Sequence, residues 1–277
     1  VDVDEDNIIS NYHMKSEEIF GLCLEDGEIL ENKYLKAREA SKKPYGKLVS
    51  DNLKVLKRGN AKEQFNGFID SKNNTPQNKF ASYNIFDEDI KKFIEPLSEN
   101  VSESTGSMGD DTPLAIFSKF DRKFYDFFKQ QFAQVTNPPI DSLRENSVMS
   151  LYKYLGSENN LLNNAPTKNS AIRISTPILS LKEVNELKSF NSWFPHQEID
   201  CFYKIGSKLD SKIELIKKNC EKSILNGNKI IFLTDQNLKH DHTPIPMLLV
   251  ISAVHHHLIE KRLRSKVSLI AVTGDVI

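Results

Sequence analysis

Lys229-Ile230-Ile231-Phe232-Leu233-Thr234 is the stretch that decides the fold class. An unbroken apolar run of this length predicts a strand that is buried on both faces. A helix is expected before it, starting at the capping-box sequence Ser211-Lys212-Ile213-Glu214 and stopping near Gly227. After it come a long helical pattern from about Pro246 to Arg262 and a second apolar run, Val267–Val272. Helix, strand, helix and strand in this order predict an α/β fold, with a parallel sheet and flanking helices.

The segment before this region continues the same alternation. Ala171–Leu179 predicts a strand because it contains β-branched residues at alternating positions. Ser180-Leu181-Lys182-Glu183 is a second capping box, so a helix is expected to begin at Ser180. Gly156 is expected to end an earlier helix that Asp141 caps.

Two further helices are predicted in the middle of the chain. Asp87 is expected to cap a helix that runs through Glu99. Asp121 opens an amphipathic helix, Arg122–Gln134, with four phenylalanines toward a core. Thr136-Asn137-Pro138-Pro139 must end this helix, because proline lacks the backbone N–H and fixes φ.

The N-terminal part is less regular. Lys33–Lys43 predicts a helix that Pro44 stops. Residues 58–82 are rich in Asn and Gly and have few apolar groups to bury, so we expect a mobile loop there.

Composition excludes several classes of protein. Hydrophobic residues make up 39% and charged residues 27% of the chain, and the formal net charge is −1. This balance is that of an ordinary globular protein and gives no overall attraction to nucleic acid or to a membrane surface. No apolar run reaches the ~18 residues that a membrane span needs. The 3 cysteines form no CxxC pair, which favours a reducing compartment, with the cytoplasm as the default.

Two histidine clusters and one pair of aspartates suggest a metal site. His255-His256-His257 are consecutive, and consecutive side chains on a helix point about 100° apart, so they do not converge on one ion. His240-Asp241-His242 is the second cluster. Asp110 and Asp111 stand in a Gly- and Pro-rich turn, where they could bind Mg²⁺ or bond the turn's own amides. A free-standing metal-dependent hydrolase that uses Asp110, Asp111 and the histidines is therefore one candidate function.

Thr234-Asp235 is a site candidate by position alone. It follows a predicted parallel strand, and ligands of α/β proteins bind at the carboxyl ends of such strands. Cys220 is expected to be a buried thiol in a helix, and Trp193 a packing residue in a loop. Together these residues do not assemble a catalytic set.

Several long strings resemble the central region of glutamate synthase large subunits, whose electron donor is ferredoxin or NAD(P)H. They occur in the family's order from about residue 84 to the end of the chain. The strings are Gly106–Ala115, Tyr125–Gln130, Phe132–Asp141, Arg144-Glu145, Val148–Leu151, Asn160–Leu162, Pro244–Met247 and Ala253–Leu258.

The resemblance implies an architecture and a set of partners. Residues 1–47 would be a tail segment that links from a glutamine amidotransferase domain, and residues 48–277 the central domain. The central domain would be an incomplete or degenerate TIM-like barrel related to the FMN-binding domain. FMN and an iron–sulfur cluster would belong to other parts of the parent enzyme, so this chain would carry no cofactor and no catalytic residue. A plastid location would follow for a eukaryotic parent.

The resemblance also assigns a tunnel wall. In the family, ammonia released from glutamine travels to the FMN domain, where it reacts with 2-oxoglutarate to form glutamate. By resemblance, Thr136, Asn137 and Pro138 would line this tunnel. A stiff corner between two helices would account for the same residues. A purely structural interaction domain is thus the third candidate function, beside the tunnel-forming domain and the hydrolase.

Overall fold

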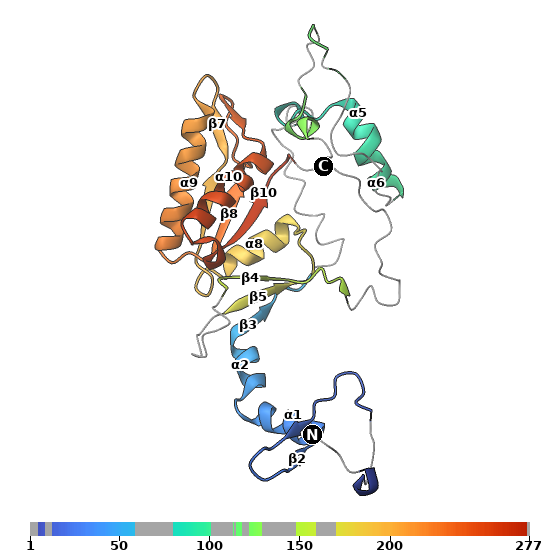
Figure 1. Cartoon of the computed structure of the whole chain (residues 1–277). Coiled ribbons are helices and arrows are strands. Elements are labelled where there is room, and N and C mark those ends of the chain that lie inside the picture. The colour runs from blue at the N-terminus through green and yellow to red at the C-terminus, as the bar shows by residue number, and fades with distance from the viewer. Residues whose placement is uncertain are drawn as a thin grey trace. The chain divides into compact units, whose positions relative to one another are not determined.

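The computed structural model of the chain describes residues 5–8, 13–58, 80–100, 113, 115–117, 122–128, 148–158 and 170–275. The chain divides into two compact units, Val1–Asn52 and Leu53–Ile277, which are described separately (Figure 1). No helix among the described residues is long and apolar enough to cross a membrane.

Unit 1 consists of short elements, and the part of it that the structure describes has no buried core. The predicted helix Lys33–Lys43 is confirmed as α1, and Pro44 separates it from a second helix. Strands β1 and β2 form a two-stranded antiparallel ladder. None of the described residues of unit 1 is buried. Its elements are η1 (Glu5–Asn7), β1 (Gly21–Leu22), β2 (Ile29–Leu30), α1 (Asn32–Ser41) and α2 (Tyr45–Asn52).

Unit 2 contains the predicted parallel sheet. Its three strands follow the order β6, β8, β10, and both pairings are parallel. The register places the last residues of the strands, Asp200, Thr234 and Val272, side by side. Helices α9 and α10 connect successive strands (Figure 1). The bounds are β6 (His196–Asp200), α9 (Leu209–Leu225), β8 (Ile230–Thr234), α10 (Met247–Glu260) and β10 (Ser268–Val272).

Strand β8 is buried throughout because both faces of the sheet are covered. Ile231 and Leu233 pack into a cluster with α9 and α10. Ile230 and Phe232 point the other way, into a cluster with a second sheet and α8 (Leu181–Ser189). The apolar run is therefore unbroken because the strand is buried on both faces, as the sequence predicted.

The second sheet has the order β3, β5, β4, with β3 parallel and β4 antiparallel to β5. Its strands are β3 (Leu53–Val55), β4 (Lys153–Leu155) and β5 (Ala171–Ile174). A third pair, β7 (Phe202–Lys204) and β9 (His242–Pro244), is antiparallel. In the part of the chain that the structure describes, these strands form separate sheets and do not close a barrel.

Three predicted elements differ from the structure. The strand from Ala171 ends at Ile174 rather than Leu179. The prediction that a helix ends at Gly156 is wrong, because the residues just before it, Lys153–Leu155, form strand β4. The prediction that a capping box at Ser211 starts the next helix is also wrong. Helix α9 begins at Leu209, so Ser211 lies inside its first turn.

The two helices of the middle region are found in altered form. The helix predicted from Asp87 is continuous but contains a π-helical segment, so it comprises α5 (Asp87–Asp89), η2 (Ile90–Ile94) and α6 (Glu95–Asn100). Within the predicted helix Arg122–Gln134, the described residues form only the short η3, Phe124–Phe127, after which Phe128 takes extended backbone with ψ 138°. The remainder of that prediction, from residue 129, lies outside the described residues, as does most of the loop predicted at 58–82.

Candidate functional site

Asp235 follows β8 directly and is the centre of a polar network at the carboxyl ends of the parallel strands. Its side chain is fully buried. Oδ1 accepts hydrogen bonds from the Tyr83 hydroxyl at 2.8 Å and from the Gly274 N–H at 3.3 Å. Oδ2 accepts one from the Thr273 hydroxyl. Three donors therefore hold this carboxylate in place.

The parallel register brings these groups together. Thr234 pairs with Val272, and the Asp235 N–H donates to the Val272 carbonyl at 3.3 Å, which extends the ladder by one residue. Burial raises the pKa of the Asp235 carboxyl above its ordinary value, while the hydrogen bonds from Thr273 and Tyr83 partly oppose this shift.

Asp275 joins the network from the other side. Its Oδ2 accepts the Met247 N–H at 2.8 Å and a hydrogen bond from the Tyr125 hydroxyl. Met247 is the first residue of α10, so this carboxylate satisfies one of the free N–H groups at the helix start. Thr273 links the two aspartates, because its Oγ1 accepts the Asp275 N–H at 3.0 Å and donates to Asp235.

Both tyrosines are donors in this network. Burial, together with the Asp235 carboxylate, raises the pKa of Tyr83, and burial with the Asp275 hydrogen bond raises that of Tyr125. They therefore remain protonated at neutral pH and keep their hydrogen atoms available to the carboxylates.

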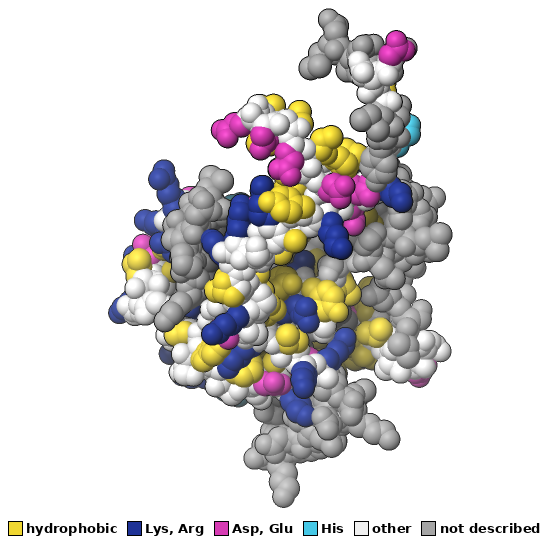
Figure 2. Space-filling view, turned by 90° about the horizontal axis from the view of Figure 1, so that it is seen from below, with side chains coloured by type: hydrophobic (Ala, Val, Ile, Leu, Met, Phe, Trp, Pro, Cys, Tyr) yellow, Lys and Arg dark blue, Asp and Glu magenta, His cyan; other side chains and the backbone are white. Residues whose placement is uncertain are grey.

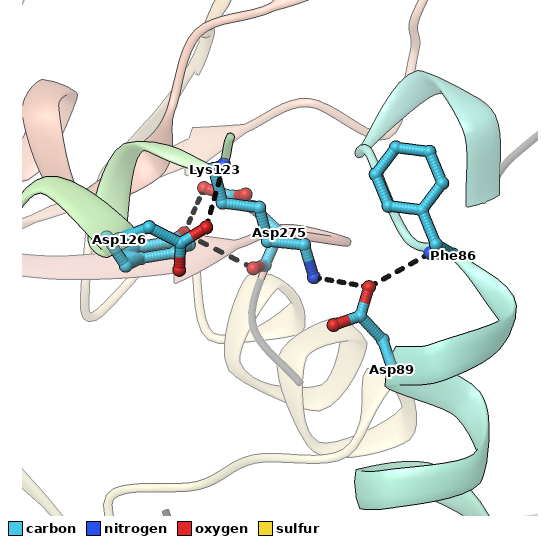
Figure 3. A network of polar contacts seen from close by, with 6 residues as sticks. Phe86, Asp89, Lys123, Asp126 and Asp275 are labelled. Carbon is cyan, nitrogen blue, oxygen red and sulfur yellow. Dashed lines mark hydrogen bonds and ion pairs between the residues drawn. The ribbon is translucent and has the colours of Figure 1, made fainter. Parts of the chain in front are cut away.

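A mostly buried ion pair ties η3 to α5. Lys123 Nζ lies 2.8 Å from Asp89 Oδ2, and Figure 3 shows the two side chains pointing toward each other. Asp89 also accepts the Phe86 N–H at 2.9 Å, and Asp126 accepts the Lys123 N–H at 3.1 Å. Through Tyr125 and Asp275, this pair is connected to the strand ends (Figure 3).

Gly274 and Tyr83 fit together closely. A Cβ placed at Gly274 would lie 2.7 and 2.8 Å from two atoms of the Tyr83 ring. Such distances are shorter than carbon–carbon contacts allow, so the ring occupies space that only glycine leaves free.

A cavity of about 1480 Å³ opens beside the network. Asp235, Tyr83 and Gly274 line one part of it, and strands β5 and β10 and helix α8 contribute apolar side chains. Lys153 and Lys239 also line it. The cavity thus lies where α/β proteins hold ligands, but the chain's own tyrosines engage the carboxylates there.

The site predicted at Thr234-Asp235 is therefore a point where distant segments are tied together. Tyr83 and Asp235 are 152 residues apart in sequence, and Tyr125 and Asp275 are 150 apart. Sequence analysis did not identify either tyrosine, since no local pattern marks a partner at that distance.

The histidines of the metal hypothesis have separate partners. His255 Nδ1 accepts the Arg264 Nε–H at 3.0 Å, His257 Nε2 lies 2.9 Å from Glu221, and His242 Nδ1 lies 2.6 Å from Asp241. Among the residues that the structure describes, no three His, Cys, Asp or Glu side chains are grouped so that they could hold a metal ion.

The other sequence-predicted site residues lie outside the described residues. They are Asp110, Asp111, Thr136, Asn137 and Pro138. Of the remaining predictions, Cys220 is confirmed as a buried thiol in α9.

Comparisons with known proteins give a consistent result. The glutamate synthase central domain family matches residues 78–277. The chain is 33% identical to the glutamate synthase [NADPH] large chain of Bacillus subtilis, with 99% of this chain and 18% of that protein covered. It is 35% identical to the chloroplastic ferredoxin-dependent glutamate synthase 2 of Arabidopsis thaliana, with 99% and 17% covered. For the ferredoxin-dependent glutamate synthase of Cyanidium caldarium, the identity is 36% and the coverage 93% and 17%. The chain thus spans less than a fifth of the length of these relatives.

Proposed function

The chain belongs to the glutamate synthase central domain family, and on this premise we propose that it is the non-catalytic central domain of a glutamate synthase large subunit. In this role it connects the amidotransferase and FMN domains and helps to form the ammonia tunnel. The parent enzyme converts glutamine and 2-oxoglutarate into glutamate.

The observation that carries the proposal is that the carboxylate of Asp235, at the end of strand β8, is hydrogen-bonded by the chain itself. Asp235 accepts hydrogen bonds from Tyr83, Thr273 and Gly274, so its lone pairs are directed at groups of the same chain. A general base must reach a substrate proton with such a lone pair. A position that binds ligands in other α/β proteins is thus used here to hold segments of the domain together, which suits a scaffold.

Unit 1 supports the connecting role. It has no buried residue among those described, while large apolar side chains such as Leu22, Leu24 and Ile29 are exposed. Figure 2 shows one face of the whole chain, on which hydrophobic side chains lie uncovered beside Lys and Arg. A segment of this size cannot bury enough apolar surface alone to be stable. We propose that residues 1–47 are a tail segment that links from the amidotransferase domain, and that residues 48–277 are the central domain.

The tunnel role rests on the resemblance and on the chemistry of ammonia. Ammonia that reaches bulk water is protonated and lost, so a tunnel needs a stiff wall with few titrating groups. Thr136, Asn137 and Pro138 meet this requirement, because the proline fixes the backbone and neither polar side chain titrates. We propose these residues as part of the wall.

The cofactors, the electron donor and the cellular location that we propose are those of the parent enzyme. We propose that FMN and an iron–sulfur cluster are held by its other domains, and that ferredoxin or an NAD(P)H-oxidising subunit supplies electrons. The domain itself would be a degenerate relative of the FMN-binding barrel. We expect the parent in the cytoplasm, or in a plastid if the source is eukaryotic, since several relatives are named chloroplastic.

The test is the coupling of the two half-reactions in the longer polypeptide. Thr136→Val and Asn137→Leu are each expected to raise the number of glutamine molecules hydrolysed per glutamate formed. Lys218→Gln, on an exposed position of α9, is the control and should leave this ratio unchanged. Unchanged coupling in both tunnel variants would remove the tunnel role.

A further inference from the structure

The cavity beside the strand ends has one wall of apolar side chains. Its volume is about 1480 Å³, which leaves ample room for a small molecule, since most ligand pockets measure about 300–1,000 Å³. Strands β4, β5 and β10, helix α8 and the segment before α8 supply this wall. The apolar residues include Leu155, Ile174, Leu179, Leu181, Val184 and Leu269. A ligand that fits this cavity therefore has an apolar body.

The charged side chains that line the cavity are almost all basic. Lys153 comes from β4, and Lys239, His240 and His242 come from the segment after β8. Neither lysine forms an ion pair with a carboxylate in the part of the chain that the structure describes. Among the described residues that line the cavity, Asp235 is the single acid.

Asp235 offers little negative charge to the cavity. Its side chain is fully buried, and its oxygens accept hydrogen bonds from Tyr83, Thr273 and Gly274. Burial also raises the pKa of this carboxyl, which favours its neutral form. The positive charges of the two lysines are therefore not balanced inside the cavity, and the cavity favours an anion.

Lys239 and His242 lie at the two ends of one tight turn, because the His242 N–H donates to the Lys239 carbonyl at 3.0 Å. His242 Nδ1 lies 2.6 Å from Asp241 Oδ1, and the imidazole packs edge-on against the Phe202 ring, with centres 5.4 Å apart. The His242 side chain is only 19% exposed. The imidazole is thus held in one orientation, and Nε2 is the ring nitrogen left for a ligand.

We propose that this cavity binds a small organic anion that consists of an apolar body and one carboxylate. The carboxylate lies at Lys239 and His242, with Lys153 on the β4 side, and the apolar body lies against α8 and β10. Lysine ammonium groups and an imidazole N–H are donors to a carboxylate, and such charge-assisted hydrogen bonds are the strong ones. The inference goes beyond the proposed function and does not depend on the tunnel.

The first test measures the binding of three probes to this chain by isothermal titration calorimetry. 3-Phenylpropionate has both the apolar body and the carboxylate, 3-phenylpropionamide has the same shape without the charge, and acetate has the charge without the body. The expected result is that 3-phenylpropionate binds about tenfold more tightly than either of the others. Equal affinity for the acid and the amide, or no binding of the acid, would overturn the proposal.

The second test locates the carboxylate with Lys239→Gln and His242→Gln, and Lys218→Gln on α9 is the control for loss of one positive charge. Lys239 is exposed, so its substitution should leave the melting temperature unchanged. Each of the first two variants should bind 3-phenylpropionate about three- to tenfold more weakly and the amide as before. Unchanged affinity for the acid in both variants, or an equal loss in Lys218→Gln, would contradict the site.

The third test locates the apolar body. Ala271 of β10 lines the cavity and is exposed, so Ala271→Phe places a ring in the space that the ligand needs. This variant should bind both the acid and the amide several-fold more weakly, with a melting temperature close to that of the wild type. Full affinity for both probes in the folded variant would show that they bind elsewhere and would overturn the proposal.

The longer polypeptide distinguishes a small molecule from a protein segment as the occupant. It should bind 3-phenylpropionate as this chain does, with the same loss in Lys239→Gln. Loss of binding in the longer polypeptide would show that another segment fills the cavity, and this result would overturn the proposal.

Discussion

Single residues at the strand ends make the first testable claims, and Gly274 is the clearest of them. Replacing Gly274 by Ala places a methyl group within 2.8 Å of the Tyr83 ring, so the ring must move and the Asp235 hydrogen bond is disturbed. We expect a loss of about 1–3 kcal/mol in the free energy of unfolding, measured by urea denaturation.

A double-mutant cycle identifies the cause. If Tyr83 is the group that the methyl meets, Gly274→Ala costs much less in a Tyr83→Ala background. Gly46→Ala is the matched control, because a Cβ at Gly46 in α2 has no atom within 4 Å and alanine favours a helix. Equal costs in both Tyr83 backgrounds would show that the contact is not the cause.

Asp235 gives a prediction about pH. Its native pKa lies above the ordinary value of 3.8, so at a pH between the unfolded and the native pKa the native state binds more protons at this group than the unfolded state does. Its contribution to stability is therefore fully present below the unfolded pKa and is lost as pH rises through the raised native pKa. We expect the wild-type protein to gain stability relative to Asp235→Asn as pH falls through the raised native pKa toward 3.8. Parallel stability curves for the two proteins would contradict the raised pKa.

The cysteines differ in reactivity. Cys201 and Cys220 are buried, and burial raises the pKa of each thiol to about 12, whereas Cys23 is partly exposed. Since the thiolate is the reactive form, a thiol reagent at pH 8 should modify Cys23 rapidly in the native chain and all three cysteines only after denaturation. Cys23→Ser should abolish the rapid phase. Rapid native modification of Cys201 or Cys220 would show that their burial is wrong.

At the scale of elements, two serines that look alike in sequence have different roles. Ser180 caps α8, since its Oγ accepts the Glu183 N–H at 3.3 Å and Glu183 accepts the Ser180 N–H at 2.7 Å. Ser180→Ala should therefore cost about 0.5–2 kcal/mol of stability. Ser211 lies inside α9 beyond its start at Leu209, so Ser211→Ala should be neutral or slightly stabilising. Thermal unfolding of the two variants measures the difference, and a cost at Ser211 equal to that at Ser180 would contradict the observed start of α9.

Elements that depend on local pattern were predictable from sequence. The strands at Ile230–Thr234 and Ser268–Val272 agree with the predictions, and the apolar run of the first is buried on both faces, whereas the second is mostly half-buried. The helix predicted from Arg122 is wrong at Phe128, where the backbone is extended, and residues just before it are held by distant partners. Lys123 is held by Asp89 and Tyr125 by Asp275, while Phe128 is extended. The helix end predicted at Gly156 is wrong because a distant partner decides the structure there: Lys153–Leu155 pairs with β5 instead of forming a helix.

At the scale of the whole molecule, the sequence predicted one half of the candidate site. Asp235 was recognisable because it follows a buried parallel strand, and the register places it beside Thr273. The tyrosines that bind the carboxylates come from segments about 150 residues away, and nothing in their local sequence reports that pairing. The tunnel residues Thr136, Asn137 and Pro138 stay a prediction from the resemblance.

The most direct test of the central claim follows the amide nitrogen of glutamine into the amino group of newly formed glutamate. The longer polypeptide that contains this chain is given glutamine labelled with ¹⁵N in the amide, together with 2-oxoglutarate, the electron donor and excess unlabelled ammonium. If this chain helps to enclose an ammonia tunnel, newly formed glutamate carries ¹⁵N in its amino group, and Thr136→Val or Asn137→Leu shifts the label toward the unlabelled pool. Glutamate that follows the unlabelled ammonium in the unaltered protein, or labelling that neither substitution changes, would contradict the account.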